Sequence, residues 1–111
     1  MIVRVNAGTI HDIESFHDAF SKAMGFFAGY GRNWDAWVDC LSYRDEADGL
    51  ASVDVRSGET LTLFIERWAG FEARCPEIAV ELLRCAAFVN SCRMTSSDEP
   101  RTPYLMIAID G

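Results

Sequence analysis

Hydrophobic and polar residues follow two different periods along this chain, and together they predict alternating strands and helices. Short apolar segments at residues 2–6 ("IVRVN"), 61–65 ("LTLFI") and 104–110 ("YLMIAID") are typical of strands. Because the last two are almost wholly apolar, we expect both of those strands to be buried, and residues 61–65 to be covered on both faces. Residues 51–55 ("ASVDV"), followed by a turn, predict a further strand-like piece.

Two helices are expected between the first two of these strands. From Asp12, a possible N-cap, apolar residues recur at helical spacing, and we expect this helix to end near Gly25. A second helix is expected from about Trp34 to Tyr43, because the side-chain oxygen of Asn33 is placed to cap it.

Two more helices are expected before the final strand. Residues 67–74 ("RWAGFEAR") suit a short helix, and Pro76 suits the first position of a longer one. The resulting order β-α-α-β-α-α-β predicts a small α/β layered fold with a parallel sheet. The chain contains no internal repeat and no linker composition, so we expect one domain over residues 1–111.

The composition is that of a folded and strongly acidic protein. Half of the 111 residues are hydrophobic, and the formal net charge is -7. This charge repels nucleic-acid phosphates and anionic membranes and favours a basic partner. The amino-terminal residues do not resemble a signal peptide, and no apolar segment is long enough to span a membrane, so the expected location is the cytoplasm.

The residues that could support catalysis or bind a metal form no recognised motif. The four cysteines lack CxxC spacing and are expected to be buried thiols rather than disulfides or metal ligands. His11 and His17 lie six residues apart, outside any zinc-binding motif, and His17 suits a partly buried helix position. Because phosphate-binding loops and nucleophile elbows are also absent from the sequence, we expect neither an enzyme nor a cofactor.

Asp35 and Asp39 form the pair of acidic residues that most strongly suggests a site. Their spacing of four places both carboxylates on one face of the second helix, whereas Trp34, Trp37 and Leu41 form the opposite, core-facing stripe. Three interpretations of the acidic face are open on chemistry alone. It is a solvated surface, a divalent-metal or acid-base site, or a binding surface for a basic protein.

The sequence around these aspartates resembles the signature of the barstar family. Residues 30–41 ("YGRNWDAWVDCL") match the pattern Tyr-Gly-x-Asn-x-Asp-Ala-x-x-Asp-Cys-Leu at every specified position. The first strand and helix, the second strand and the short helix after it also resemble the family, so the resemblance covers most of the chain. It implies a three-stranded parallel sheet flanked by helices, and an intracellular inhibitor of small secreted ribonucleases.

The resemblance also implies roles for individual residues. The second helix and the loop before it would plug the active-site cleft of the ribonuclease, with Asp39 in the place of a substrate phosphate and Asp35 as a second acceptor. Tyr30 would support that loop or contact the partner. The predicted partner-binding residues are Tyr30, Gly31, Asn33, Asp35, Ala36, Asp39 and Ser42.

Several positions depart from the family pattern. Val38 stands where the family has an exposed tryptophan, and Cys85 aligns with an acidic residue of the last helix, with Glu81 one turn away. The segments 44–59 and 94–103 are longer than in the family. We therefore expect an immunity-type inhibitor of a basic ribonuclease or ribonuclease-like toxin, and the alternative is a barstar-like module whose partner is not a nuclease.

Overall fold

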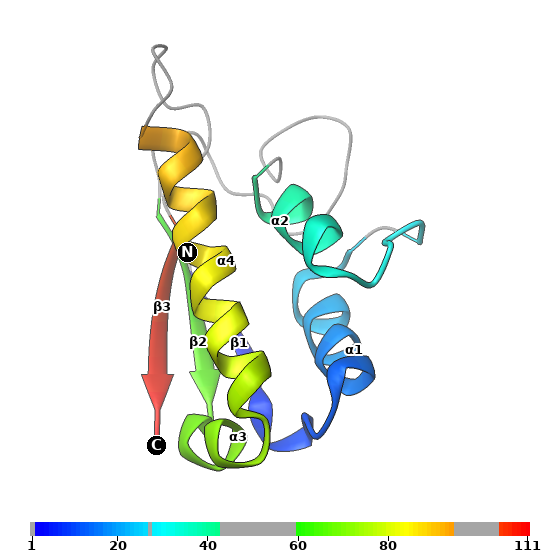
Figure 1. Ribbon diagram of the computed structural model, residues 1–111, viewed down its shortest axis with the longest axis vertical. Coiled ribbons are helices and arrows are strands. Elements are labelled where there is room, and N and C mark those ends of the chain that lie inside the picture. Colours follow the sequence, from blue (N-terminus) through cyan, green and yellow to red (C-terminus); the bar gives the residue numbers. More distant parts are fainter. Residues whose placement is uncertain (1, 27, 43–59, 95–104) are drawn as a thin grey trace.

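The chain folds into a three-stranded parallel sheet packed against helices, as a computed structural model shows (Figure 1). The structure describes residues 2–26, 28–42, 60–94 and 105–111, with the backbone alone at 42 and 92–94. In chain order the elements are β1 (Ile2–Asn6), the 3-10 helix η1 (Ala7–Thr9), α1 (Ile13–Met24), α2 (Trp34–Ser42), β2 (Leu61–Glu66), α3 (Trp68–Arg74), α4 (Pro76–Met94) and β3 (Leu105–Asp110). The α/β fold with a parallel sheet is confirmed. The strand-like piece expected at 51–55, and the longer segment 44–59 around it, lie outside the described residues.

Strand β2 is the centre of the sheet, with β1 on one side and β3 on the other. Both pairs are parallel, and Leu63 lies opposite Val3 in β1 and Ile107 in β3. Parallel neighbours cannot be joined by a tight hairpin, so each connection needs a long crossover. Helices α1 and α2 precede β2 in the chain, and α3 and α4 precede β3.

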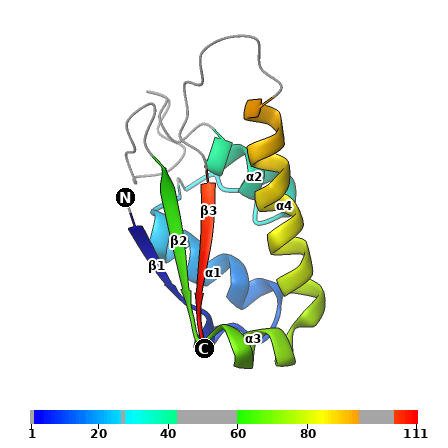
Figure 2. The same ribbon diagram turned by 90° about the vertical axis from the view of Figure 1, so that its left-hand side faces the viewer.

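The expectation of a strand covered on both faces is wrong for the described part of the chain. Along β2, Leu61, Leu63 and Ile65 are buried, and the residues between them are only half-buried. In Figure 2 the strands face the viewer and the helices lie behind and beside them. Strand β3 is not the buried strand expected either, because Met106 and Ile109 are 58% and 56% exposed. A single helical layer buries one face of a sheet, and apolar residues on the other face reflect strand preference rather than burial.

Helix α1 begins and ends at the residues that its sequence indicates. The Asp12 carboxylate accepts a hydrogen bond from the Ser15 backbone N–H at 2.8 Å, and the Ser15 hydroxyl accepts one from the Asp12 N–H at 3.1 Å. Gly25 ends the helix with a φ of 64°, a left-handed conformation that costs glycine little. These two caps fix where α1 starts and where the loop to α2 leaves it.

The core lies between the helical layer and the sheet. Its largest fully buried side chains include Phe16 and Phe20 of α1, Trp37 and Leu41 of α2, and Phe71 of α3. The expected core positions of Trp37 and Leu41 are therefore confirmed. The cysteines Cys40, Cys75 and Cys85 are buried thiols, as predicted. Among the described residues, no helix is long and apolar enough to cross a membrane.

Candidate functional site

The first turn of α2 is held by the side chain of Asn33. Its Oδ1 atom accepts a hydrogen bond from the Ala36 backbone N–H at 2.8 Å, and its carbonyl accepts one from the Trp37 N–H at 3.0 Å. The predicted cap is confirmed. It satisfies a backbone donor that the helix itself leaves unpaired, and it sets the direction in which α2 leaves the loop.

Tyr30 anchors that loop from the inside. Its ring is only 9% exposed and packs on Phe26, with the ring centroids 4.5 Å apart. Its hydroxyl lies 2.7 Å from Nδ1 of His17, which is buried in α1. Burial raises the pKa of Tyr30 and, as the main cause, lowers the pKa of His17, so both groups are neutral near pH 7. Of the two roles considered for Tyr30, this geometry favours support of the loop.

Arg32 fastens the outer side of the loop to α1. Its Nη2 atom donates to the Glu14 carbonyl and carboxylate, each at 3.0 Å, and to the Asp18 carboxylate at 2.9 Å. Its backbone has a φ of 55°, which is unusual for a residue with a side chain. Sequence reasoning missed this contact. The available signal was the spacing of four between Glu14 and Asp18, which puts two carboxylates on one face of α1.

Gly31 and Ala36 form a close contact between the loop and the helix. A Cβ atom at residue 31 would lie 3.2 Å from Nδ2 of Asn33 and 3.5 Å from Cβ of Ala36. The glycine thus lets the loop approach the capping side chain without displacing it. Ser42 is the last residue of α2, and its side chain lies outside the description.

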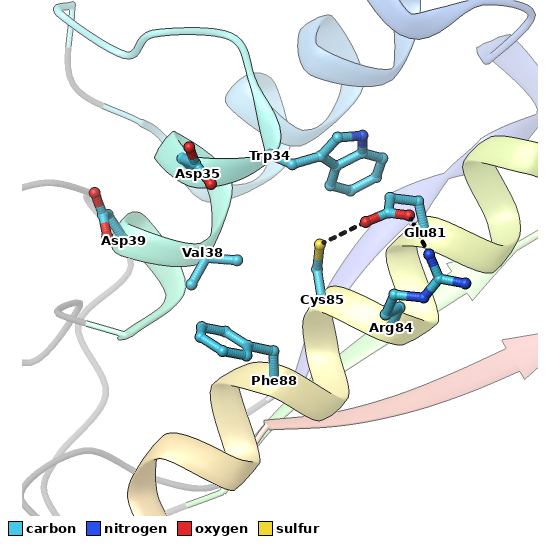
Figure 3. Close-up of a pocket in the computed structure, with 8 residues that line it drawn as sticks. All are labelled: Trp34, Asp35, Val38, Asp39, Glu81, Arg84, Cys85 and Phe88. Carbon is cyan, nitrogen blue, oxygen red and sulfur yellow. Dashed lines mark hydrogen bonds and ion pairs between the residues drawn. The ribbon is translucent and has the colours of Figure 1, made fainter.

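Asp35 and Asp39, which we call the α2 pair, lie on the exposed side of the helix. Both are exposed, and none of the described residues forms a hydrogen bond or an ion pair with either carboxylate. Figure 3 shows the two side chains on the same side of α2, one turn apart. The spacing argument from the sequence therefore places these two residues correctly.

A groove separates α2 from α4 beside this pair (Figure 3). We call it the α2–α4 groove. It has a volume of about 560 Å³ and is lined by Trp34, Asp35, Val38, Asp39, Glu81, Arg84, Cys85 and Phe88. Trp34 is only half-buried here, although its ring packs on Phe16 with 4.7 Å between the centroids. The prediction that Trp34 belongs to the core is thus only partly right.

The α4 side of the groove contains Glu81 and Cys85, the two residues that lie at or near the family's acidic position in the last helix. Glu81 accepts hydrogen bonds from Nη1 of Arg84 at 3.1 Å and from the thiol of Cys85 at 3.6 Å. Burial raises the pKa of Cys85 to about 11, so its thiol is protonated and unreactive near pH 7. Glu81 is accordingly the carboxylate of α4 in this groove, and its charge is already paired with Arg84.

The described residues provide no group of three His, Cys, Asp or Glu side chains that could hold a metal ion. The two exposed aspartates alone would offer a hard cation few of the oxygen ligands that it needs. The interpretation of the acidic face as a metal site therefore gains no support from the geometry.

Comparison with known proteins gives one family. A family model described as "Barstar (barnase inhibitor)" matches residues 1–101, which contain the capped loop, α2 and α4. No curated protein matches the chain.

Proposed function

Since the chain belongs to the barstar family, whose members are ribonuclease inhibitors rather than enzymes, we propose that it inhibits a small basic ribonuclease or ribonuclease-like toxin by occluding its active site. The surface that does so is the exposed side of α2 together with the loop before it. The observation that carries this proposal is the α2 pair, two adjacent carboxylates that the described part of the chain leaves without a basic partner.

The chemistry of the α2 pair suits a cleft built to bind RNA. A ribonuclease holds substrate phosphates with Arg and Lys side chains, and a carboxylate presents the same kind of anionic oxygens to them. Asp39 would take the place of a phosphate, and Asp35 would accept from a neighbouring basic group. A net charge of -7 would speed the encounter with a basic partner through long-range attraction.

The loop and α2 are held in place before any partner arrives. Tyr30 and Arg32 tie the loop to α1, and the Asn33 side chain caps the first turn of α2. A surface that needs little ordering on binding loses less conformational entropy, so more of the contact energy appears as affinity.

The test is inhibition of RNA cleavage by barnase and by a panel of other small basic ribonucleases. We expect the protein to inhibit at least one of them. The double variant Asp35→Asn/Asp39→Asn should lose that inhibition, while Glu72→Gln/Glu77→Gln, which removes an equal charge at two exposed positions of α3 and α4, should keep it. Wild-type protein that binds and inhibits no ribonuclease of the panel, or two double variants that inhibit equally, would contradict the proposal.

A further inference from the structure

The floor of the α2–α4 groove is apolar and open to solvent. Phe88 is 57% exposed, and Trp34 and Val38 are half-buried on the facing helix. Figure 3 shows Val38 and Phe88 pointing toward each other across the groove. Exposed apolar surface bordered by polar groups is a common mark of protein interaction sites, because burying it on binding is favourable.

The charge around this floor is distributed unevenly. On the α2 side, Asp35 and Asp39 have no basic partner among the described residues. On the α4 side, the Glu81 carboxylate already accepts from Arg84 and Cys85. A ligand of this groove therefore needs an apolar group for the floor and cationic groups next to α2.

The size and charge of the groove restrict what can occupy it. A volume of about 560 Å³ admits a large side chain together with its neighbours, rather than a single methyl group. The acidic edge repels nucleic-acid phosphates, and it also opposes a second copy of this chain, whose net charge is -7. A segment of a basic protein can place an apolar side chain on the floor of the groove and cationic side chains at its acidic edge.

We propose that the α2–α4 groove receives an aromatic or branched aliphatic side chain of the ribonuclease, presented beside Arg or Lys residues that pair with Asp35 and Asp39. This inference rests on the proposed function and adds a specificity element to it. Charge selects basic ribonucleases in general, whereas Phe88, Val38 and Trp34 select those whose apolar side chain fits the groove.

The test compares two alanine variants of α4 on each ribonuclease that the wild-type protein inhibits. Phe88→Ala removes the floor of the groove, and Leu83→Ala removes an apolar side chain that is 44% exposed on the same helix but does not line the groove. We expect Phe88→Ala to weaken binding about tenfold or more, as for an anchor residue at the centre of an interface. Leu83→Ala should leave affinity unchanged within about twofold, since most contacts outside such anchors are nearly neutral.

The salt dependence of binding distinguishes the contribution of the groove to affinity from that of Asp35 and Asp39. The loss of affinity caused by Phe88→Ala should be the same at low and high salt, because burial of apolar surface is not screened. The loss caused by Asp35→Asn/Asp39→Asn should shrink as salt rises. Val38→Ala provides a second variant, on the α2 side of the groove floor, and thermal unfolding checks that each variant is folded.

Failure of this inference is distinguishable from failure of the proposed function. If Phe88→Ala and Val38→Ala bind every inhibited ribonuclease as tightly as Leu83→Ala does, while Asp35→Asn/Asp39→Asn has lost inhibition, the groove proposal is wrong and the proposed function stands. If the wild-type protein inhibits no ribonuclease of the panel, both proposals are wrong.

Discussion

Helices α1 and α2 each have two carboxylates four residues apart, but only one of the two pairs has a cationic partner within the described structure. On α1, Glu14 and Asp18 share the guanidinium of Arg32 at 3.0 and 2.9 Å. On α2, Asp35 and Asp39 have no such partner among the described residues. Like charges at this spacing disfavour a helix by a few tenths of a kcal/mol, so an unpaired pair is a small cost of folding that a basic partner could offset.

The difference has a structural consequence. The α1 pair holds the loop that leads into α2, because Arg32 belongs to that loop. Its charges therefore act inside the protein, where they position the other pair. The α2 pair lies beyond this loop and faces outward, so its charges are available to another molecule.

The strongest way to break the comparison is to give α2 its own cation. In Asp39→Arg the new guanidinium lies four residues from Asp35, as a neutralising partner. We expect the binding free energy for the ribonuclease to weaken by more than about 2 kcal/mol. This is the general scale for charged pairs at protein interfaces, and it was established in part on the barnase–barstar complex. The free energy of unfolding should stay the same or rise by about 0.3–0.5 kcal/mol, because the new pair stabilises the helix. Titration calorimetry and thermal unfolding measure the two effects.

The control for this variant is Glu72→Arg, which changes the net charge equally at an exposed position of α3. It should reduce affinity far less than Asp39→Arg does. Equal losses in the two variants would mean that overall charge, and not the α2 pair, governs binding.

Removing the internal anchor of the loop tests whether the α2 pair depends on being held in place. Tyr30→Phe deletes the hydroxyl that faces Nδ1 of His17, and Nε2 of that ring already has no hydrogen-bond partner among the described residues. We expect the free energy of unfolding to fall by about 1–3 kcal/mol, the cost of an unsatisfied buried polar group. Affinity should fall less than in Asp39→Arg. Unchanged stability in urea unfolding would contradict this role of Tyr30.

Removing the Arg32 side chain leaves the α1 pair without a cationic partner, as the α2 pair is. Arg32→Ala leaves Glu14 and Asp18 without their shared cation, and we expect only a small loss of stability, since all three groups are exposed and screened by solvent. Arg32→Gly loses the same contacts but relieves the φ of 55°, so it should be the more stable of the two variants. The order of their melting temperatures checks this, and a more stable alanine variant would contradict it.

The smallest expected effect is on the pH dependence of stability. Burial lowers the pKa of His17 from its usual 6.5, so the folded protein holds this ring neutral where the unfolded chain would protonate it. The contribution of neutral His17 to folding stability is therefore complete above about pH 6.5, and it is lost as the pH falls toward the pKa of His17 in the folded protein. His17→Gln should flatten the stability profile just below about pH 6.5, above the range in which ordinary carboxylates titrate. Parallel profiles for the two proteins would contradict this assignment.

Features that depend on neighbours in the sequence could be predicted without the structure. The Asp12 cap, the Gly25 stop, the Asn33 cap and the helix beginning at Pro76 were all predicted correctly, because each rests on hydrogen bonds or dihedral angles within a few residues. Placement relative to other elements was predicted less well. Strand β3 is apolar, yet Met106 is exposed, because burial depends on what packs against each face of the sheet.

The candidate site divides in the same way. The spacing of Asp35 and Asp39 is enough to put them on one face of a helix, and the motif around them is enough to indicate the family. The groove could not be predicted, because it forms where α2 packs near α4, and nothing local to Phe88 shows that this ring stays exposed beside Val38.

The sequence by itself therefore determined the four helices, three strands, the Asp12, Gly25 and Asn33 caps, the parallel topology and the spacing of four within each acidic pair, since all of these follow from spacing and local chemistry. Only the tertiary structure decided which pair has a cationic partner. A guanidinium in the loop reaches two carboxylates on α1 because the anchored loop brings it there. Beside Asp35 and Asp39, the fold pairs Arg84 with Glu81 instead. Attraction between charges depends on their distance in space, and folding sets that distance.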